Sequence, residues 1–184
     1  METMETAILG GGCFWCLEAA LRQLEGVESV VSGYCGGHLD NPGYERVCEG
    51  DTGHAEVVQV RFNPAIIDYG TLLRAFFAIH DPTTRNRQGN DVGPQYRSVI
   101  FACSPEQERT ARGLIAELDA ARLWPQPIVT EVLPAPTFWP AEDYHQDYLA
   151  HHPAQPYCIA VVAPKAAKLR KEFADRLKRK GAPT

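Results

Sequence analysis

Hydrophobic side chains recur at two different spacings along this chain, and segments with the two spacings alternate. Residues 55–62 place Val58, Val60 and Phe62 on one side and more polar positions on the other, which is the period of a half-buried strand. Residues 13–24 place apolar side chains three and four positions apart, which is the period of a helix with one buried face. The pattern therefore predicts a fold that mixes strands with helices.

The remaining segments extend this alternation. Short apolar or β-branched runs predict further strands at 5–9, 27–34, 97–102 and 128–133. Helical spacing, with capping residues at Asp68 and Ser104, predicts further helices at 68–80, 104–122, 141–150 and 164–180. The segment 83–95 has no apolar period, so we expect a long loop there, and long loops in compact domains are often functional.

Length and composition narrow the class of protein. A chain of 184 residues without a repeat or linker is expected to form a single domain over 1–184. A net charge of −5 is too small to indicate a nucleic-acid partner, and we interpret the basic positions within 165–180 as the solvated face of the last helix. No apolar run approaches the roughly 20 residues of a membrane span, and the first residues do not resemble a signal peptide. We therefore expect a cytoplasmic protein that binds neither membrane nor nucleic acid.

Cysteine gives the first chemical signal. The chain has six cysteines, too few for a disulfide scaffold, and only Cys13 and Cys16 form a close pair, within the stretch LGGGCFWCL. Cys13 follows a strand and three glycines at the predicted first turn of a helix. Amides at a helix N-terminus favour an anion, so we expect the Cys13 thiol to ionise more readily than a free thiol.

From the residues alone, several interpretations of this pair stay open. Zinc needs about four ligands, and no second cluster of cysteine or histidine complements the pair, so we expect no metal. A dithiol of the thioredoxin type would use both cysteines but would leave Phe14 and Trp15 unexplained. A single reactive thiolate would use the glycines to turn the backbone sharply and present Cys13. The alternative without function is a buried cysteine at a strand–helix corner.

Five blocks of the sequence, taken together, resemble the A class of peptide methionine sulfoxide reductases. They occur in the family's order at 12–15, 32–37, 44–56, 88–98 and 141–146. The resemblance implies an α/β (α+β) two-layer sandwich with a ferredoxin-like core, a mixed sheet and extra carboxy-terminal helices. The order β-α-β-β-α-β that the patterns predict from 5–9 through 97–102 fits such a core. The activity it implies is reduction of methionine sulfoxide, the S epimer, to methionine.

The resemblance also implies roles for individual residues. Cys13 is expected to attack the sulfoxide sulfur as a thiolate. Glu56 falls on the family's acid position, where partial desolvation would raise the pKa of its carboxyl and let it donate a proton to the oxygen. Tyr34 and Tyr96 match the hydroxyls that bind that oxygen. Asp91 is expected to orient water or the substrate.

The substrate's methyl group and the second thiol complete the expected site. Phe14 and Trp15 would form the wall around the methyl group. Attack leaves Cys13 as a sulfenic acid, and a second thiol must then form a disulfide that an external dithiol reduces. Many family members resolve with cysteines in a glycine-rich tail, which this chain lacks. Cys16, one helical turn away, is our first candidate, and Cys158 is the second.

The resemblance implies no cofactor. It implies thioredoxin as the reductant, which dithiothreitol can replace, and oxidised proteins or free methionine sulfoxide as substrates. We expect a monomer. A general dithiol–disulfide oxidoreductase is the alternative function.

Overall fold

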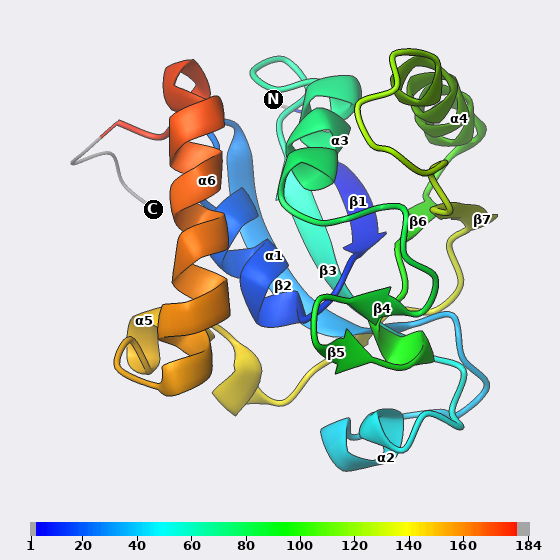
Figure 1. The fold of residues 1–184 in the computed structure, drawn as a ribbon, viewed down its shortest axis with the longest axis vertical. Coiled ribbons are helices and arrows are strands. Elements are labelled where there is room, and N and C mark those ends of the chain that lie inside the picture. The colour runs from blue at the N-terminus through cyan, green and yellow to red at the C-terminus, as the bar shows by residue number, and fades with distance from the viewer. Residues whose placement is uncertain (1–2, 180–184) are drawn as a thin grey trace.

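A computed structural model describes residues 3–179 and builds them around one six-stranded sheet (Figure 1). Met1, Glu2 and the predicted end of the last helix at Lys180 lie outside the described residues. Helices α1 (Phe14–Leu21), α3 (Tyr69–Ala78) and α6 (Ala163–Glu172) lie together on the face of the sheet that is turned towards the viewer in Figure 1. Within the described part of the chain, no helix combines the length and apolar character that crossing a membrane requires.

The sheet has the strand order β7-β6-β1-β3-β2-β8. Its strands are β1 (Glu5–Gly10), β2 (Val27–Cys35), β3 (Ala55–Phe62), β6 (Val99–Ala102), β7 (Glu131–Pro134) and β8 (Trp139–Pro140). The inner four strands pair antiparallel, β8 adds antiparallel to β2, and β7 adds parallel to β6. The inner order β6-β1-β3-β2, with α1 and α3 as connections, is the ferredoxin-like arrangement, so the predicted fold class is confirmed.

Strand β3 separates two hydrophobic clusters by the alternation that its sequence predicts. Val58, Val60 and Phe62 belong to the large core beneath the helices, whereas Val57 packs with residues such as Phe101 on the opposite face. Side chains two positions apart in a strand share a face. Glu56 therefore points to the helix side, towards the start of α1.

The predicted helix over 141–150 is wrong. A 3-10 turn occupies Asp143–His145, and a separate short helix, α5, occupies Tyr148–His151. Between them Gln146 is extended, with ψ 138°, and Asp147 is left-handed, with φ 53°. Neither conformation fits a continuous helix, so the apolar spacing there does not reflect one helical face.

The last helix is shorter than the range 164–180 that its apolar spacing predicts. A π-helical turn at Cys158–Val162 leads into α6, which ends at Glu172 because Phe173 leaves the helical conformation. The chain then makes a short 3-10 turn, and Leu177 pairs with Leu24. The chain that follows α6 therefore returns beside the turn that follows α1.

The segment 83–95 contains more structure than the predicted loop. Strands β4 (Arg87–Gln88) and β5 (Asp91–Val92) form a small hairpin, followed by a 3-10 turn at Pro94–Tyr96. Helix α4 (Pro105–Ala120) is confirmed, and the Ser104 side chain caps it by accepting from the Gln107 amide. The periodicity did not predict α2 (Tyr44–Cys48), because five residues are too few to show a helical repeat.

The glycine loop after β1 rests on His80. A Cβ atom at Gly11 would lie 2.8 Å from the His80 ring, so only glycine fits there. The ring is buried, and both of its nitrogens are hydrogen-bonded: Nδ1 donates to the Phe76 carbonyl (2.6 Å), and Nε2 accepts from the Ser98 hydroxyl (2.8 Å). Burial lowers the pKa of His80 to about 4.

We expect acid to destabilise the fold through His80. The unfolded chain binds a proton at this histidine below pH of about 6.5, whereas the folded chain does so only near pH 4. The free energy of unfolding contributed by His80 is therefore complete above the unfolded pKa and falls by roughly 3 kcal/mol as the pH drops through this window. Urea unfolding across the window should show a shallower loss for His80→Gln than for the wild type. The exposed-site control His151→Gln should keep the wild-type slope, and equal slopes for all three proteins would contradict the assignment.

Candidate functional site

Cys13 lies where β1, the glycine loop and α1 meet. Gly12 has φ 83°, a conformation that favours glycine, and its amide donates to the Tyr96 carbonyl (3.2 Å). Cys13 itself is extended and forms the N-cap of α1, one residue before the first helical residue. The predicted presentation of Cys13 by glycines at a helix start is therefore confirmed in its geometry.

The prediction that Cys13 ionises readily is wrong for this structure. Its side chain is only 8% exposed, and burial raises the pKa of the Cys13 thiol well above its usual value. A hydrogen bond with Cys16 raises the pKa further, and the amide of Trp15 at the helix start lowers it by less. The Cys16 thiol has a lowered pKa because it receives that hydrogen bond, and the charge of Lys165 also lowers it.

Glu56 lies beside the nucleophile, held by the helix that Cys13 caps. Its Oε1 accepts from the Phe14 amide (3.1 Å), and its Oε2 has no hydrogen-bond partner among residues 3–179. The residue is 1% exposed, and burial raises the pKa of its carboxyl to about 8, against the opposing effect of the Phe14 amide. At neutral pH the carboxyl therefore carries a proton.

The tyrosines divide into two groups. Tyr34 pairs with Glu56 in the register of β2 and β3, yet its hydroxyl donates to Glu142 Oε1 (3.0 Å). Tyr44, on α2, and Tyr96 have hydroxyls whose pKa is raised first by burial and next by Glu56. Glu56 thus acts on the hydroxyl of Tyr96, which the sequence named, and on that of Tyr44, which the sequence reasoning missed although it begins the block 44–56.

The two aromatic residues after Cys13 have different environments. Phe14 is fully buried, with its ring 5.1 Å from the ring of His145 and 5.6 Å from that of Tyr34. Trp15 is half-buried and stacks on Tyr148, with ring centroids 3.6 Å apart and planes within 3°. Its Nε1 donates to His145 Nδ1 (3.1 Å). Phe14 is therefore part of the core, whereas Trp15 borders the site.

The hairpin and the carboxy-terminal segment meet beside the thiols. Asp91 Oδ2 accepts from the Tyr157 hydroxyl (2.6 Å). Tyr157 also lies close enough to Cys16 to lower the pKa of that thiol, and it turns its ring edge to Trp15, at a centroid distance of 5.9 Å. Next to it, Cys158 is buried and close enough to Cys16 for that thiol to raise its pKa. Sequence spacing did not link Tyr157 to the site, because it lies 66 residues from Asp91.

The thiols are all unpaired in this structure. Cys13, Cys16 and Cys158 are buried free cysteines. In residues 3–179 no group of three or more His, Cys, Asp or Glu side chains has an arrangement that could hold a metal ion.

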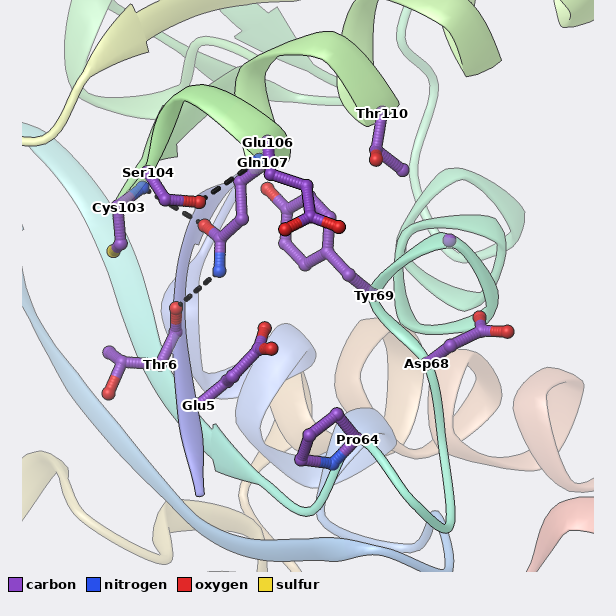
Figure 2. Close-up of a pocket in the computed structure, with 11 residues that line it drawn as sticks. Glu5, Thr6, Pro64, Asp68, Tyr69, Cys103, Ser104, Glu106, Gln107 and Thr110 are labelled. Atoms are coloured by element: carbon purple, nitrogen blue, oxygen red, sulfur yellow. Dashed lines mark hydrogen bonds between the residues drawn. The ribbon is translucent and has the colours of Figure 1, made fainter. Parts of the chain in front are cut away.

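A cavity of about 690 Å³ lies at the other end of β1 (Figure 2). The start of β1, the start of α3 and the first turn of α4 enclose it, and Gln107 crosses it to donate to the Thr6 carbonyl (2.9 Å). Glu5 lines this cavity, and the strand from Glu5 to Gly10 spans roughly 17 Å before the glycine loop. The cavity is therefore separate from Cys13.

Comparisons with known proteins agree on one family. The family model described as peptide methionine sulfoxide reductase matches residues 5–177. The protein named peptide methionine sulfoxide reductase MsrA from Chromobacterium violaceum is 61% identical over 174 residues, which are 95% of this chain and 99% of that protein. The reduced form of Mxr1 from Saccharomyces cerevisiae superposes with a TM-score of 0.79 at 37% identity, over 84% of this chain and 89% of that one. Mxr1 in complex with Trx2 is also similar, with a TM-score of 0.55 at 26% identity, over 79% of this chain and 84% of that one.

We expect two buried carboxyls to titrate near neutral pH. Burial raises the pKa of Glu56 to about 8 and that of Glu18, which pairs with Arg22, to about 7. Infrared difference spectroscopy during a pH titration should show two protonated carboxyl bands. Glu56→Gln should remove the band that disappears near pH 8, and Glu18→Gln should remove the other. A Glu56→Gln spectrum identical to that of the wild type would show that Glu56 is already ionised at neutral pH.

Proposed function

The chain belongs to the peptide methionine sulfoxide reductase family, and from this premise we propose how its own residues carry out the reaction. The protein is an enzyme that reduces methionine sulfoxide at the expense of thiols. One hydrogen bond supports our assignment of residues. The amide of Phe14, the residue directly after Cys13, donates to the Glu56 carboxyl. A nucleophile and a proton donor therefore share one helix start.

Glu56 supplies the proton that makes the sulfoxide reactive. A sulfoxide sulfur accepts a nucleophile only when its oxygen is protonated or strongly hydrogen-bonded. Burial keeps the carboxyl protonated, and Oε2 is unpartnered among residues 3–179, so its proton is available to that oxygen. As the oxygen takes this proton, the carboxylate recovers one from the Cys13 thiol. The thiol that is neutral at rest thus becomes the attacking thiolate only in the presence of substrate.

The products balance without an external oxidant. Cys13 sulfur bonds to the sulfoxide sulfur, the oxygen passes to Cys13, and methionine leaves, so Cys13 becomes a sulfenic acid. Cysteine sulfur loses the two electrons that methionine sulfur gains. A second thiol then attacks the sulfenic acid, releases water and forms a disulfide.

We assign the oxygen-binding hydroxyls to Tyr96 and Tyr44. Both have Glu56 as the charge with the largest effect on the pKa of the hydroxyl, and phenols donate without adding charge. Tyr34 acts indirectly in this proposal. Its hydroxyl holds Glu142 Oε1, and Glu142 Oε2 accepts from the Tyr44 amide (3.2 Å). Tyr34 would thereby fix the position of Tyr44.

The remaining expected residues have supporting roles. Trp15, half-buried and fixed by Tyr148 and His145, forms the wall for the substrate's methyl group. Phe14 supports that wall from the core. Asp91 orients the substrate or water through its hydrogen bond with Tyr157.

Cys16 is the resolving thiol in this proposal, with Cys158 as the alternative. The Cys16 amide donates to the Cys13 carbonyl (3.1 Å), which holds the two residues within one turn, and the lowered pKa of the Cys16 thiol favours it as the second nucleophile. Cys158 is the second candidate because it lies near Cys16.

The reductant and the substrates follow from the family. We propose that thioredoxin reduces the disulfide, as the Mxr1 complex with Trx2 suggests for a relative, and that no cofactor takes part. Substrates are S-epimer methionine sulfoxide in oxidised proteins or as the free amino acid, and the enzyme works as a monomer in the cytoplasm.

Substitution of the nucleophile and the acid tests this assignment. With dithiothreitol as reductant, Cys13→Ser should release no methionine from free or peptide-bound sulfoxide, with or without a chelator. Glu56→Gln should lower the rate at neutral pH by about 10²–10⁴-fold. The wild-type rate should fall as the pH rises through about 8, because Glu56 then loses its proton. Full activity of Glu56→Gln would remove the acid role, and insulin reduction without sulfoxide turnover would favour a general disulfide reductase.

The resolving role can be assigned by separating one turnover from many. Cys16→Ser should release one methionine per protein in a single turnover yet fail to cycle with thioredoxin, because no disulfide forms. Cys158→Ser should cycle normally. Cys35→Ser, a buried thiol on the opposite face of the sheet, is the matched control. Normal cycling by Cys16→Ser with loss in Cys158→Ser would transfer the role to Cys158.

A further inference from the structure

A groove of about 680 Å³ lies beside the first turns of helix α6. Residues of the β4–β5 hairpin line it, and so do residues of the π-helical turn and the start of α6. We call it the lysine groove. Its lining includes Asp81, Asp91, Trp124, Tyr157, Val161, Lys165 and Lys168.

The inner end of the lysine groove reaches the nucleophile's loop. Lys165 Nζ lies 3.9 Å from the position that a Cβ atom on Gly12 would take, one residue before Cys13. Asp91 and Tyr157, which are hydrogen-bonded to each other, line the same end, and Tyr157 contacts Cys16. The groove therefore adjoins the site at the Asp91–Tyr157 hydrogen bond.

The outer end of the groove is marked by Lys168 and Trp124. Both also line an adjoining hollow that includes Phe77, on the side away from the hairpin. Lys165 and Lys168 are separated by about 4.5 Å along the helix axis. The two ammonium groups therefore follow the groove outwards from the thiols.

The groove is lined by two lysines of α6 and by two aspartates, Asp81 and Asp91, so its formal charges cancel. In residues 3–179, neither Lys165 nor Lys168 forms a salt bridge with a carboxylate. Its two acidic residues already accept hydrogen bonds from neighbours: Asp91 from Tyr157, and Asp81 from the amide and hydroxyl of Thr83. The two lysines have no ionic partner within the described residues, so they are the groups of the groove with which an anionic side chain can pair.

We propose that the lysine groove binds the peptide segment next to an oxidised methionine and favours substrates with an aspartate or glutamate two or three residues from it. An extended peptide advances about 3.3 Å per residue, so such a carboxylate reaches the lysines while the sulfoxide lies at Cys13. The half-buried Trp124 and Val161 offer apolar surface to the peptide's side chains. A volume of this size suits a few residues of a peptide rather than the face of a folded protein. The inference rests on the proposed role of Cys13.

Matched peptides test the preference. Each peptide carries one methionine sulfoxide and has Asp, Ala or Lys two residues before or after it, and dithiothreitol serves as reductant so that thioredoxin is not involved. We expect kcat/KM at low salt to be about two- to five-fold higher for Asp than for Ala, and lower for Lys. The preference should shrink at high salt, because salt screens exposed charges. Equal values for the three side chains on both sides of the methionine would overturn the proposal.

Variants of α6 then assign the preference to the groove. The double variant Lys165→Met/Lys168→Met should bring the Asp-to-Ala ratio of kcat/KM close to one. The ratio cancels any general loss of activity. Lys171→Met changes the same charge on the same helix outside the groove and should keep the wild-type ratio. An unchanged ratio in the double variant, or a defect confined to thioredoxin-driven turnover, would overturn the proposal.

Failure of the assigned chemistry would give a different result. If the wild type reduced no peptide, the role of Cys13 would be wrong while binding could still be measured. Calorimetric titration with the reduced, methionine-containing Asp and Ala peptides gives the affinity ratio without turnover. A higher affinity for the Asp peptide that is lost in the double variant would support the groove independently, and equal affinities would overturn it.

Discussion

The hydrogen bond from the Phe14 amide to Glu56 joins the sheet to the helix that carries the nucleophile. It forms because the alternation of β3 turns Glu56 to the helix side and because the glycine loop lets α1 begin directly above that point. An N-terminal amide of a helix is one of the few donors that has no partner within the helix itself. The acid thus occupies a position that the fold leaves open, and the helix start gains a hydrogen bond that would otherwise go to water.

Burial sets the protonation of the whole site. Both the Cys13 thiol and the Glu56 carboxyl have raised pKa values, and desolvation is the first cause in each case. Each group is therefore neutral in the absence of substrate, and two charges that would repel each other do not form in the same apolar space. The resting enzyme carries a thiol of low reactivity beside an acid that is ready to donate. Reactivity then depends on a substrate oxygen that can accept a proton.

Periodicity predicted the elements that bury one continuous face, and it failed where the backbone departs from regular conformation. The alternation in β3 and the helical spacing after Cys13 predicted the two elements, but Glu56 was named as the acid only through the family resemblance. The left-handed Asp147 divides a segment whose apolar spacing suggested one helix, and spacing contains no sign of it. The environment of Cys13 was misjudged because local sequence reports the helix start but not the distant segment that covers it. Tyr44 and Tyr157 were missed for the same reason: each comes from a segment that reaches the site only through tertiary contacts.

The cover over the thiols comes from the late part of the chain. Tyr157, Cys158 and α6 close over a helix that begins at residue 14, and the bond between Asp91 and Tyr157 joins the two sides of that cover. During synthesis on the ribosome, α1 therefore emerges long before the residues that shield it. Until they follow, Cys13 and Cys16 are exposed to whatever oxidants surround the nascent chain. An enzyme that repairs oxidative damage is thus itself most open to such damage before its synthesis is complete.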